Sequence, residues 1–137
     1  MKKLLICLSA MTIAACSRVP NNIDGNHAFF AFDSAQISKD ARDELESQAL
    51  YMKKNPNTTI TIEGRCDERG STEYNLALGV LRAGNAAHVI TQDGVESERI
   101  KTISYGKENP IYSGTGEEVW AKNRNTTTRV QEIKTEE

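Results

Sequence analysis

Apolar positions along the chain recur at intervals that predict helices and strands in alternation. The first helical face consists of residues spaced by four, four and three, namely Ala41, Leu45, Ala49 and Met52. Ser38 precedes this face and is a residue type that favours the N-cap position, whereas Asn55 and Pro56 interrupt it. The pattern therefore predicts a helix from about residue 38 to residue 55.

A second, longer helix is predicted from about Glu73 to Gln92, where an Asp-Gly pair ends it. Its expected core stripe consists of Leu76, Val80, Ala83, Ala87 and Ile90. Glycine costs a helix about 1 kcal/mol relative to alanine. Gly79 therefore indicates that a ligand or another backbone approaches the helix closely at this position. The alternative is that the glycine has no such role and its cost to the helix is tolerated. A short third helix is expected over residues 117–124.

Alternating or aromatic-rich segments predict four strands, over residues 27–33, 58–63, 100–105 and 127–133. The resulting order of strand, helix, strand, helix, strand, short helix, strand favours a sheet covered by helices. A chain of 137 residues, 38% apolar and 26% charged, suits a single globular domain. We expect this domain to span residues 27–134.

The first residues have the layout of an export signal. A short basic start precedes an apolar run of about a dozen residues, which is shorter than the roughly 20 residues of a membrane-spanning helix. The segment Ile13-Ala14-Ala15-Cys16 is similar to a bacterial lipobox, which predicts a signal peptide over residues 1–15 and lipidation of Cys16. Residues 16–26 are mostly polar and predict a tether. An ordinary secretory signal followed by a chance cysteine is the alternative.

Charge and cysteine content exclude several classes of protein. The net charge is −2, or −4 once Lys2 and Lys3 leave with the signal (15 basic against 19 acidic residues), and no basic stripe suits a nucleic acid. Cys7 lies in the export segment and Cys16 is the expected lipid site, so Cys66 remains alone. A disulfide within one mature chain is therefore excluded.

The second helix carries polar residues that core packing does not require. Asn75, Leu78 and Arg82 share a face about a third of a turn from the expected core stripe. If the preceding loop folds back, Asp67 joins Arg82 in one pocket, and an acid and an arginine held apart suit a zwitterion. Pairing of both side chains with neighbours on a solvated surface is the alternative, and spacing alone favours it.

A long ordered motif adds to this interpretation. Residues 62–79, IEGRCDERGSTEYNLALG, resemble the signature of the peptidoglycan-associated lipoproteins within the OmpA-like C-terminal domain family. Further matching segments are residues 29–37, 94–110 and 120–124. The resemblance spans about residues 27–133 and implies a two-layer α/β (α+β) sandwich of βαβαβ(α)β order, with helices on a four-stranded mixed sheet.

The resemblance also implies roles for individual residues. Asp67 and Arg82 are expected to clamp the ammonium and the carboxylate at the free end of meso-diaminopimelate in a peptidoglycan stem peptide. The remaining expected binding residues are Phe32, Asp33, Asn75 and Leu78, with Thr72 and Arg124 as weaker candidates. Three positions depart from the usual pattern: Arg65 for histidine, which is expected to add positive charge at the loop, Leu81 for arginine, and Asn125 for arginine.

The function implied is an outer-membrane lipoprotein that holds the membrane to peptidoglycan without covalent bonds, within the Tol-Pal system of envelope integrity and cell division. Ser17 permits delivery to the outer membrane. The expected partners are peptidoglycan, the Tol β-propeller and the Tol inner-membrane protein, with no cofactor and no metal. The alternative is a tethered adaptor for Tol proteins with weak or no wall binding. An enzyme built on Cys66 with His27 or His88 is disfavoured, because no local signature accompanies them.

Overall fold

The computed structural model describes residues 18–133, so the expected signal peptide and Cys16 lie outside the described residues. The elements follow the predicted order, with a 3-10 turn at Ser97–Arg99: β1 (His27–Phe29), α1 (Lys39–Lys54), β2 (Thr58–Arg65), α2 (Thr72–Gln92), β3 (Ile100–Gly106), α3 (Glu117–Asn123) and β4 (Asn125–Glu132). The first strand was expected over residues 27–33 but ends at Phe29. After Phe29 the chain continues as a loop that reaches toward α2.

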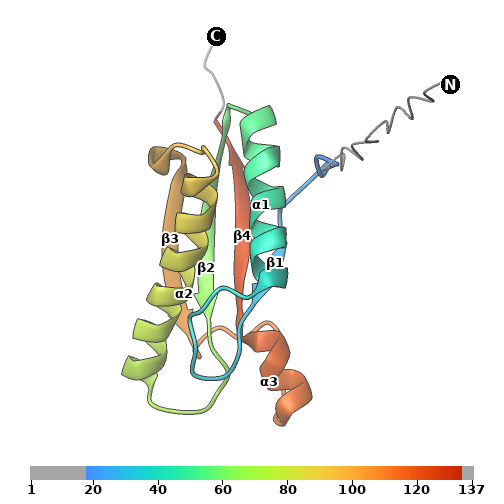
Figure 1. Ribbon diagram of the computed structural model, residues 1–137. Helices are drawn as coiled ribbons and strands as arrows, with labels where there is room; N and C mark the ends of the chain where they lie inside the picture. Colours follow the sequence, from blue (N-terminus) through green and yellow to red (C-terminus); the bar gives the residue numbers. More distant parts are fainter. Residues whose placement is uncertain (1–17, 134–137) are drawn as a thin grey trace, which may run out of the picture.

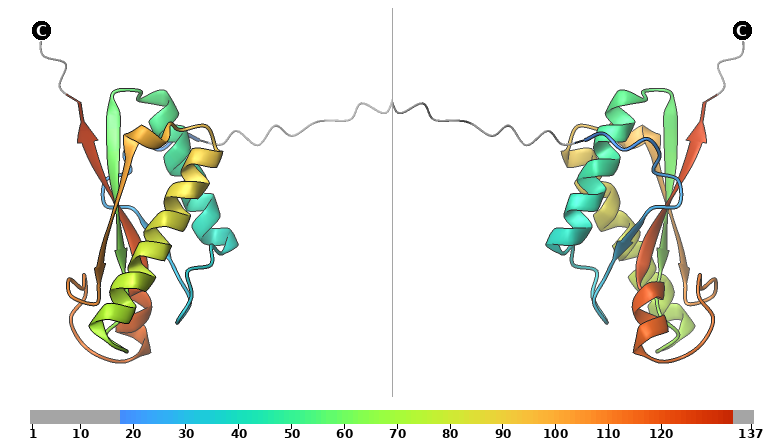
Figure 2. Two further views of the ribbon diagram at one scale, coloured as in Figure 1. Left: turned by 90° about the vertical axis from the view of Figure 1, so that its left-hand side faces the viewer. Right: turned by 90° about the vertical axis from the view of Figure 1, so that its right-hand side faces the viewer.

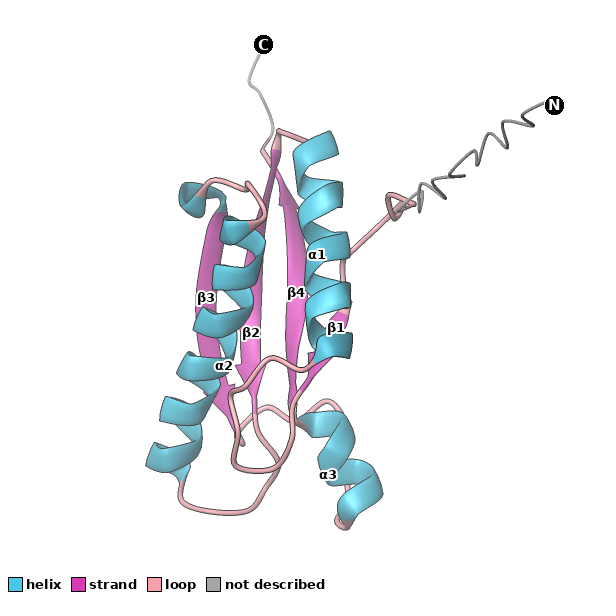
Figure 3. Ribbon diagram, in the orientation of Figure 1, coloured by secondary structure: helices cyan, strands magenta, loops and turns pink. Residues whose placement is uncertain are grey.

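The four strands form one mixed sheet in the order β1-β4-β2-β3. β2 and β3 run parallel, whereas β4 runs antiparallel to both β1 and β2. Helices α1 and α2 cover one face of this sheet, and α3 lies at the end where β1 and β2 finish (Figures 1, 2 and 3). The predicted two-layer architecture is therefore confirmed.

Helix α1 buries the face that its apolar spacing predicted. Ser38 caps it by accepting a hydrogen bond from the Ala41 backbone N–H at 3.1 Å. The predicted core residues are at most 3% exposed, and they pack against the sheet: Ala41, Leu45, Ala49 and Met52. Gln48 is buried on the same face and accepts a hydrogen bond from Thr128 of β4.

Helix α2 buries the predicted face only in its C-terminal half, where Ala83 and Ile90 are fully buried and Ala87 packs against the core. Leu76 and Val80 were expected in the core but are 38% and 58% exposed. The face that packs inward consists of Asn75, Leu78, Gly79, Arg82, Ala83, Ala86, Val89 and Ile90. Gly79 explains the difference in the N-terminal half, because the helix there lies directly against β2 and β3. A Cβ on Gly64 would collide with the Gly79 carbonyl, and a Cβ on Gly79 would collide with the Ser104 side chain. The close approach that Gly79 indicated is therefore to another backbone.

The segment before β1 packs on the domain. Ile23 is fully buried in the core, although it falls within the stretch expected to act as a tether. The Gly25 N–H donates to the Thr128 carbonyl at 2.8 Å, and the Thr128 N–H donates to the Asn26 carbonyl at 3.0 Å. Residues 23–26 therefore belong to the folded domain. Within residues 18–133, no helix has both the length and the apolarity to cross a membrane.

Candidate functional site

A cavity of about 380 Å³ opens at the end of the sheet near α3. The loop after β1, the loop between β2 and α2, and the first three turns of α2 line it, through Phe32, Asp33, Cys66, Asp67, Arg69, Gly70, Tyr74, Asn75, Leu78 and Arg82. All six expected binding residues, which are Phe32, Asp33, Asp67, Asn75, Leu78 and Arg82, are among them. The structure thus brings together residues that lie up to 50 positions apart in the sequence.

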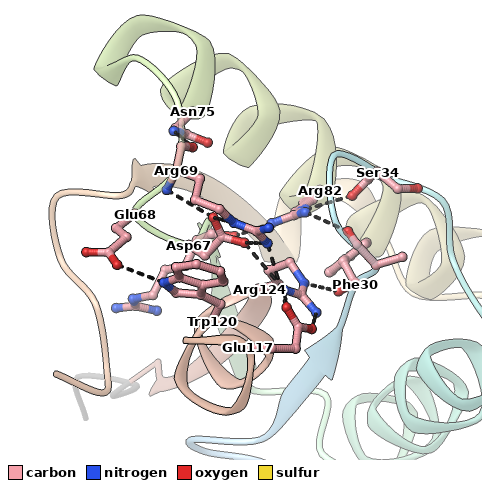
Figure 4. A network of polar contacts seen from close by, with 12 residues as sticks. Phe30, Ser34, Asp67, Glu68, Arg69, Asn75, Arg82, Glu117, Trp120 and Arg124 are labelled. Atoms are coloured by element: carbon pink, nitrogen blue, oxygen red, sulfur yellow. Dashed lines mark hydrogen bonds and ion pairs between the residues drawn. The ribbon is translucent and has the colours of Figure 1, made fainter. Parts of the chain in front are cut away.

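Arg82 is the most deeply buried charge of the cavity, with only 1% of its surface exposed. Its guanidinium donates from Nε to the Ser34 carbonyl at 2.8 Å, from Nη1 to the Arg65 carbonyl at 2.8 Å, and from Nη2 to the Ala31 carbonyl at 3.0 Å (Figure 4). Burial lowers the pKa of Arg82 from its usual value, yet a guanidinium stays charged at neutral pH. Since it has five N–H groups, two remain for a ligand.

Asp67 is 4% exposed and already has cationic partners. Its Oδ1 accepts from the backbone N–H and the Nε of Arg69 at 3.0 and 3.2 Å, and its Oδ2 accepts from Arg69 Nη2 at 2.8 Å and from Arg124 Nη1 at 3.4 Å (Figure 4). Burial alone would raise the pKa of Asp67, but the hydrogen bonds and charge of Arg69, together with Arg124, bring it below its usual range. The carboxylate is therefore ionised and fully engaged at neutral pH.

Arg69 is a part of the site that the sequence analysis did not single out. Its guanidinium carbon lies 3.8 Å from the centre of the Phe32 ring and 4.2 Å from the centre of the Trp120 ring. The Trp120 Nε1 donates to Glu68 at 2.8 Å, which fixes the indole (Figure 4). Arg69 lies within the DERG segment of the matched motif, but its position between two aromatic rings depends on α3, about 50 residues away along the chain.

Tyr74 is a second lining residue that the sequence analysis missed. Its hydroxyl donates to the carboxylate of Asp33 across the mouth of the cavity. Asp33 has a φ of +52° and is the only described residue other than glycine with a positive φ. Aspartate tolerates this conformation better than most residues, and such backbone geometry occurs often at ligand sites.

The remaining expected residues shape the cavity wall or lie behind it. Asn75 donates to the carbonyls of Arg69 and Ser71 and so holds the loop before α2 in place, while Leu78 presents an apolar wall. Thr72 bonds to Glu108 outside the cavity. Arg124 lies behind Asp67, where it pairs with Glu117 at 2.7 Å and donates to the Phe30 carbonyl at 3.0 Å.

Cys66 lines the cavity but is 3% exposed, and its thiol donates to the Asn75 carbonyl at 3.3 Å. Burial raises the pKa of this thiol, so it stays protonated at neutral pH. A protonated thiol is a poor nucleophile. Within residues 18–133, no three His, Cys, Asp or Glu side chains gather in a group able to hold a metal ion.

The three departures from the family pattern lie away from the cavity. Arg65 was expected to add positive charge to the loop, but its side chain points to the sheet face without helices and pairs with Glu63 at 3.0 Å. The Arg65 side chain also donates to the Asn109 carbonyl at 2.8 Å. The contact of Arg65 with Arg82 is made by its backbone, since the Arg65 carbonyl accepts from Arg82. Leu81 is 58% exposed on the outer side of α2. Asn125 is fully buried and donates to the Lys122 carbonyl at 2.8 Å.

Comparisons with known proteins agree with this geometry. The sequence model of the OmpA family matches residues 29–124. The "Peptidoglycan-associated lipoprotein" of Agrobacterium fabrum is 44% identical over 104 residues, which are 76% of this chain and 59% of that protein. The protein of the same name from Haemophilus influenzae is 33% identical over 142 aligned positions, covering 90% of this chain and 93% of the relative. The chain thus spans about three fifths of the length of the Agrobacterium protein and nearly all of the Haemophilus protein.

A solved structure shows the same fold. The crystal structure of the peptidoglycan-associated lipoprotein from Burkholderia pseudomallei superposes with a TM-score of 0.74 at 37% identity, covering 77% of this chain and 89% of that one. The family model thus gives the OmpA family, and the relatives and the solved structure give the peptidoglycan-associated lipoproteins. The chain belongs to the peptidoglycan-associated lipoproteins of the OmpA family, a family of structural proteins and not of enzymes.

Proposed function

We propose that this chain binds peptidoglycan, and that the cavity holds the free end of meso-diaminopimelate in the stem peptide. The observation that carries the proposal is the buried guanidinium of Arg82, which lines the cavity with two N–H groups free of backbone partners. A carboxylate is the ligand group that best matches two N–H groups of a guanidinium. Burial strengthens such a bond because little water competes for it.

The charges around the cavity favour a ligand end with no net charge. The charged residues that line it are two carboxylates and two guanidiniums, Asp33 and Asp67 against Arg69 and Arg82. Behind them Arg124 pairs with Glu117. An anion alone or a cation alone would upset this balance in a partly buried site. The free end of meso-diaminopimelate carries an ammonium and a carboxylate on one carbon, so it can meet both signs of charge at once.

Binding of the ammonium at Asp67 requires an exchange of cations. Arg69 occupies this carboxylate in the structure, and its side chain is 31% exposed, so it can turn toward solvent. The incoming ammonium then replaces the guanidinium as hydrogen-bond donor. Because Trp120 stacks on Arg69 and is the only tryptophan of the chain, its fluorescence should change when this exchange occurs.

The test is calorimetric titration of residues 18–137 with a soluble muropeptide that contains meso-diaminopimelate. We expect saturable binding, accompanied by a change in Trp120 fluorescence. A muropeptide with lysine at the same position should bind at least tenfold more weakly, about 1.4 kcal/mol, because lysine lacks the carboxylate that Arg82 would hold. No binding by the folded domain would overturn the proposal and leave the tethered adaptor for Tol proteins as the better explanation.

A matched pair of carboxylate variants separates the cavity from the rest of the fold. Asp67→Asn should weaken binding at least tenfold, about 1.4 kcal/mol, because an amide cannot replace the charge that attracts an ammonium. Glu63→Gln is the control, since Glu63 is also a buried carboxylate paired with two arginines, Arg65 and Arg129, but on the opposite face of the sheet. Equal losses in both variants would show that binding depends on overall stability and not on the cavity.

The finer parts of the proposal follow from family membership and the export signal. Lipidation of Cys16 would hold one end of the protein in the outer membrane while the domain binds the wall in the periplasm. No covalent bond is made or broken, and many weak contacts along one wall add up through avidity. The Tol β-propeller and the Tol inner-membrane protein are the proposed protein partners. Mass spectrometry of the mature N-terminus tests the lipid, and co-purification with each Tol protein tests the partners.

A further inference from the structure

The outer face of α2 carries almost no charge, although it faces solvent. Between Glu73 and His88 the only charged side chain of this helix is Arg82, which is buried beneath it. Val80 and Leu81 are each 58% exposed on the outer face. No other described element covers this side of α2 (Figure 2). A contiguous apolar strip on a soluble domain indicates an interaction surface.

The residues of this strip form a regular line along the helix. At about 100° per residue, the line consists of Glu73, Ala77, Gly84 and His88, with Val80 and Leu81 on either side of its middle. A Cβ added to Gly84 would meet nothing within 4 Å, so the surface above it is open. Small residues two turns apart leave room for the side chains of a second helix between them.

We propose that this strip binds the same strip of a second copy of the chain, with the two α2 helices antiparallel. A twofold axis at the level of Val80 and Leu81 places Ala77 opposite Gly84 of the second copy and Val80 beside its Leu81. The same axis brings Glu73 next to His88 of the second copy, so an acceptor meets a donor at both ends. A parallel pair would instead place Glu73 beside Glu73 and His88 beside His88. The strip is therefore complementary to itself in the antiparallel orientation and not in the parallel one, which favours a second copy as its partner.

Pairing along this strip leaves the cavity open. Three of its α2 lining residues, Asn75, Leu78 and Arg82, lie on the opposite, inward side of the helix. The fourth, Tyr74, bonds to Asp33 at the mouth of the cavity. The contact extends over about 22 Å, because fifteen steps of helix rise 1.5 Å each. One helix pair makes an interface below the usual size, so the dimer should depend on protein concentration.

Analytical ultracentrifugation of residues 18–137, which include the whole described core, tests the association. We expect the wild type to shift from monomer to dimer as its concentration rises, and the Leu81→Arg variant to remain monomeric. Ile103→Lys is the control, because Ile103 is 42% exposed on β3 and places the same kind of change on another face. A wild type that stays monomeric up to about 1 mM, well above the range of weak specific complexes, would overturn the proposal. So would a dimer that Leu81→Arg leaves intact.

Cysteine cross-linking tests the orientation in a Cys66→Ala background. A disulfide needs Cα atoms within about 7 Å. In the antiparallel pair Ala77→Cys faces Gly84→Cys of the other copy, whereas two copies of Ala77→Cys stand about 10 Å apart along the axis. A mixture of the two variants should therefore form the mixed disulfide several-fold faster than either variant alone forms its own. Faster cross-linking of Ala77→Cys with itself would overturn the antiparallel arrangement.

Discussion

Helices α1 and α2 cover the same face of the sheet, yet they bury different kinds of side chain. The inward face of α1 is apolar apart from Gln48, whereas the inward face of α2 begins with Asn75, Leu78, Gly79 and Arg82 and becomes apolar only from Ala83 onward. The outward faces differ in the opposite sense, because α1 exposes charged residues and α2 exposes Val80 and Leu81. One helix therefore mainly stabilises the core, and the other also builds the cavity.

The difference follows from where each helix ends relative to the sheet. The C-terminal half of α2 packs on the apolar core with Leu45, Ile60 and Ile62. Its N-terminal half borders the loops after β1 and β2, whose carbonyl groups need hydrogen-bond donors, and Arg82 supplies them. Buried polar groups of this kind are stable only when they are satisfied, and the described part of the chain holds no buried side-chain nitrogen or oxygen without a partner.

The largest expected effects separate these two roles. Arg82→Ala should lower the free energy of unfolding by about 3–5 kcal/mol, because the carbonyl groups of Ala31, Ser34 and Arg65 lose their donor. Leu45→Ala should cost about 2–5 kcal/mol by leaving a cavity in the core. Urea denaturation measures both. At a temperature where both variants are folded, only Arg82→Ala should also lose muropeptide binding, and equal affinities would remove the distinction between the two helices.

A pair of glycine variants tests how closely α2 approaches the sheet. Gly64→Ala should cost about 3 kcal/mol, because the new methyl group collides with the backbone carbonyl of Gly79. Gly84 lies on the open side of α2, and Gly84→Ala should instead stabilise the protein by about 0.5–1 kcal/mol, because alanine has a higher helix propensity than glycine. Thermal unfolding at low protein concentration compares them. A mild effect of Gly64→Ala would mean that the helix can move away from β2.

The smallest expected effect concerns acid. The pKa of Asp67 is lowered in the folded protein, so the stability contributed by its pairing with Arg69 is present above the usual aspartate pKa of about 4 and is lost as the pH falls through the lowered value. Urea midpoints between about pH 2 and pH 6 should therefore fall more steeply toward acid in the wild type than in Asp67→Asn. Parallel curves would show that Asp67 makes no net contribution through its charge.

The amino-acid sequence by itself determined the order of the elements, the face of α1, and six of the ten residues that line the cavity. These succeeded because α1 has a regular apolar period and because a long motif carries Asp67 and Arg82 at a fixed spacing. Local patterns and family motifs are properties of the chain alone, so they can be recognised before folding is known.

Only the tertiary structure decided which face of the N-terminal half of α2 is buried, where Arg65 points, and how Arg69 is held. Apolar periodicity predicts Ala83 and Ile90 correctly but wrongly places Leu76 and Val80 in the core, because glycine packing and carbonyl groups from distant loops outweigh the burial of those two side chains. The position of Arg69 between Phe32 and Trp120 depends on three segments that meet only after folding. Contacts between residues far apart in the chain leave no periodic signal. The sequence could therefore name most of the cavity residues, but not Arg69, Tyr74 or the contacts that these two make.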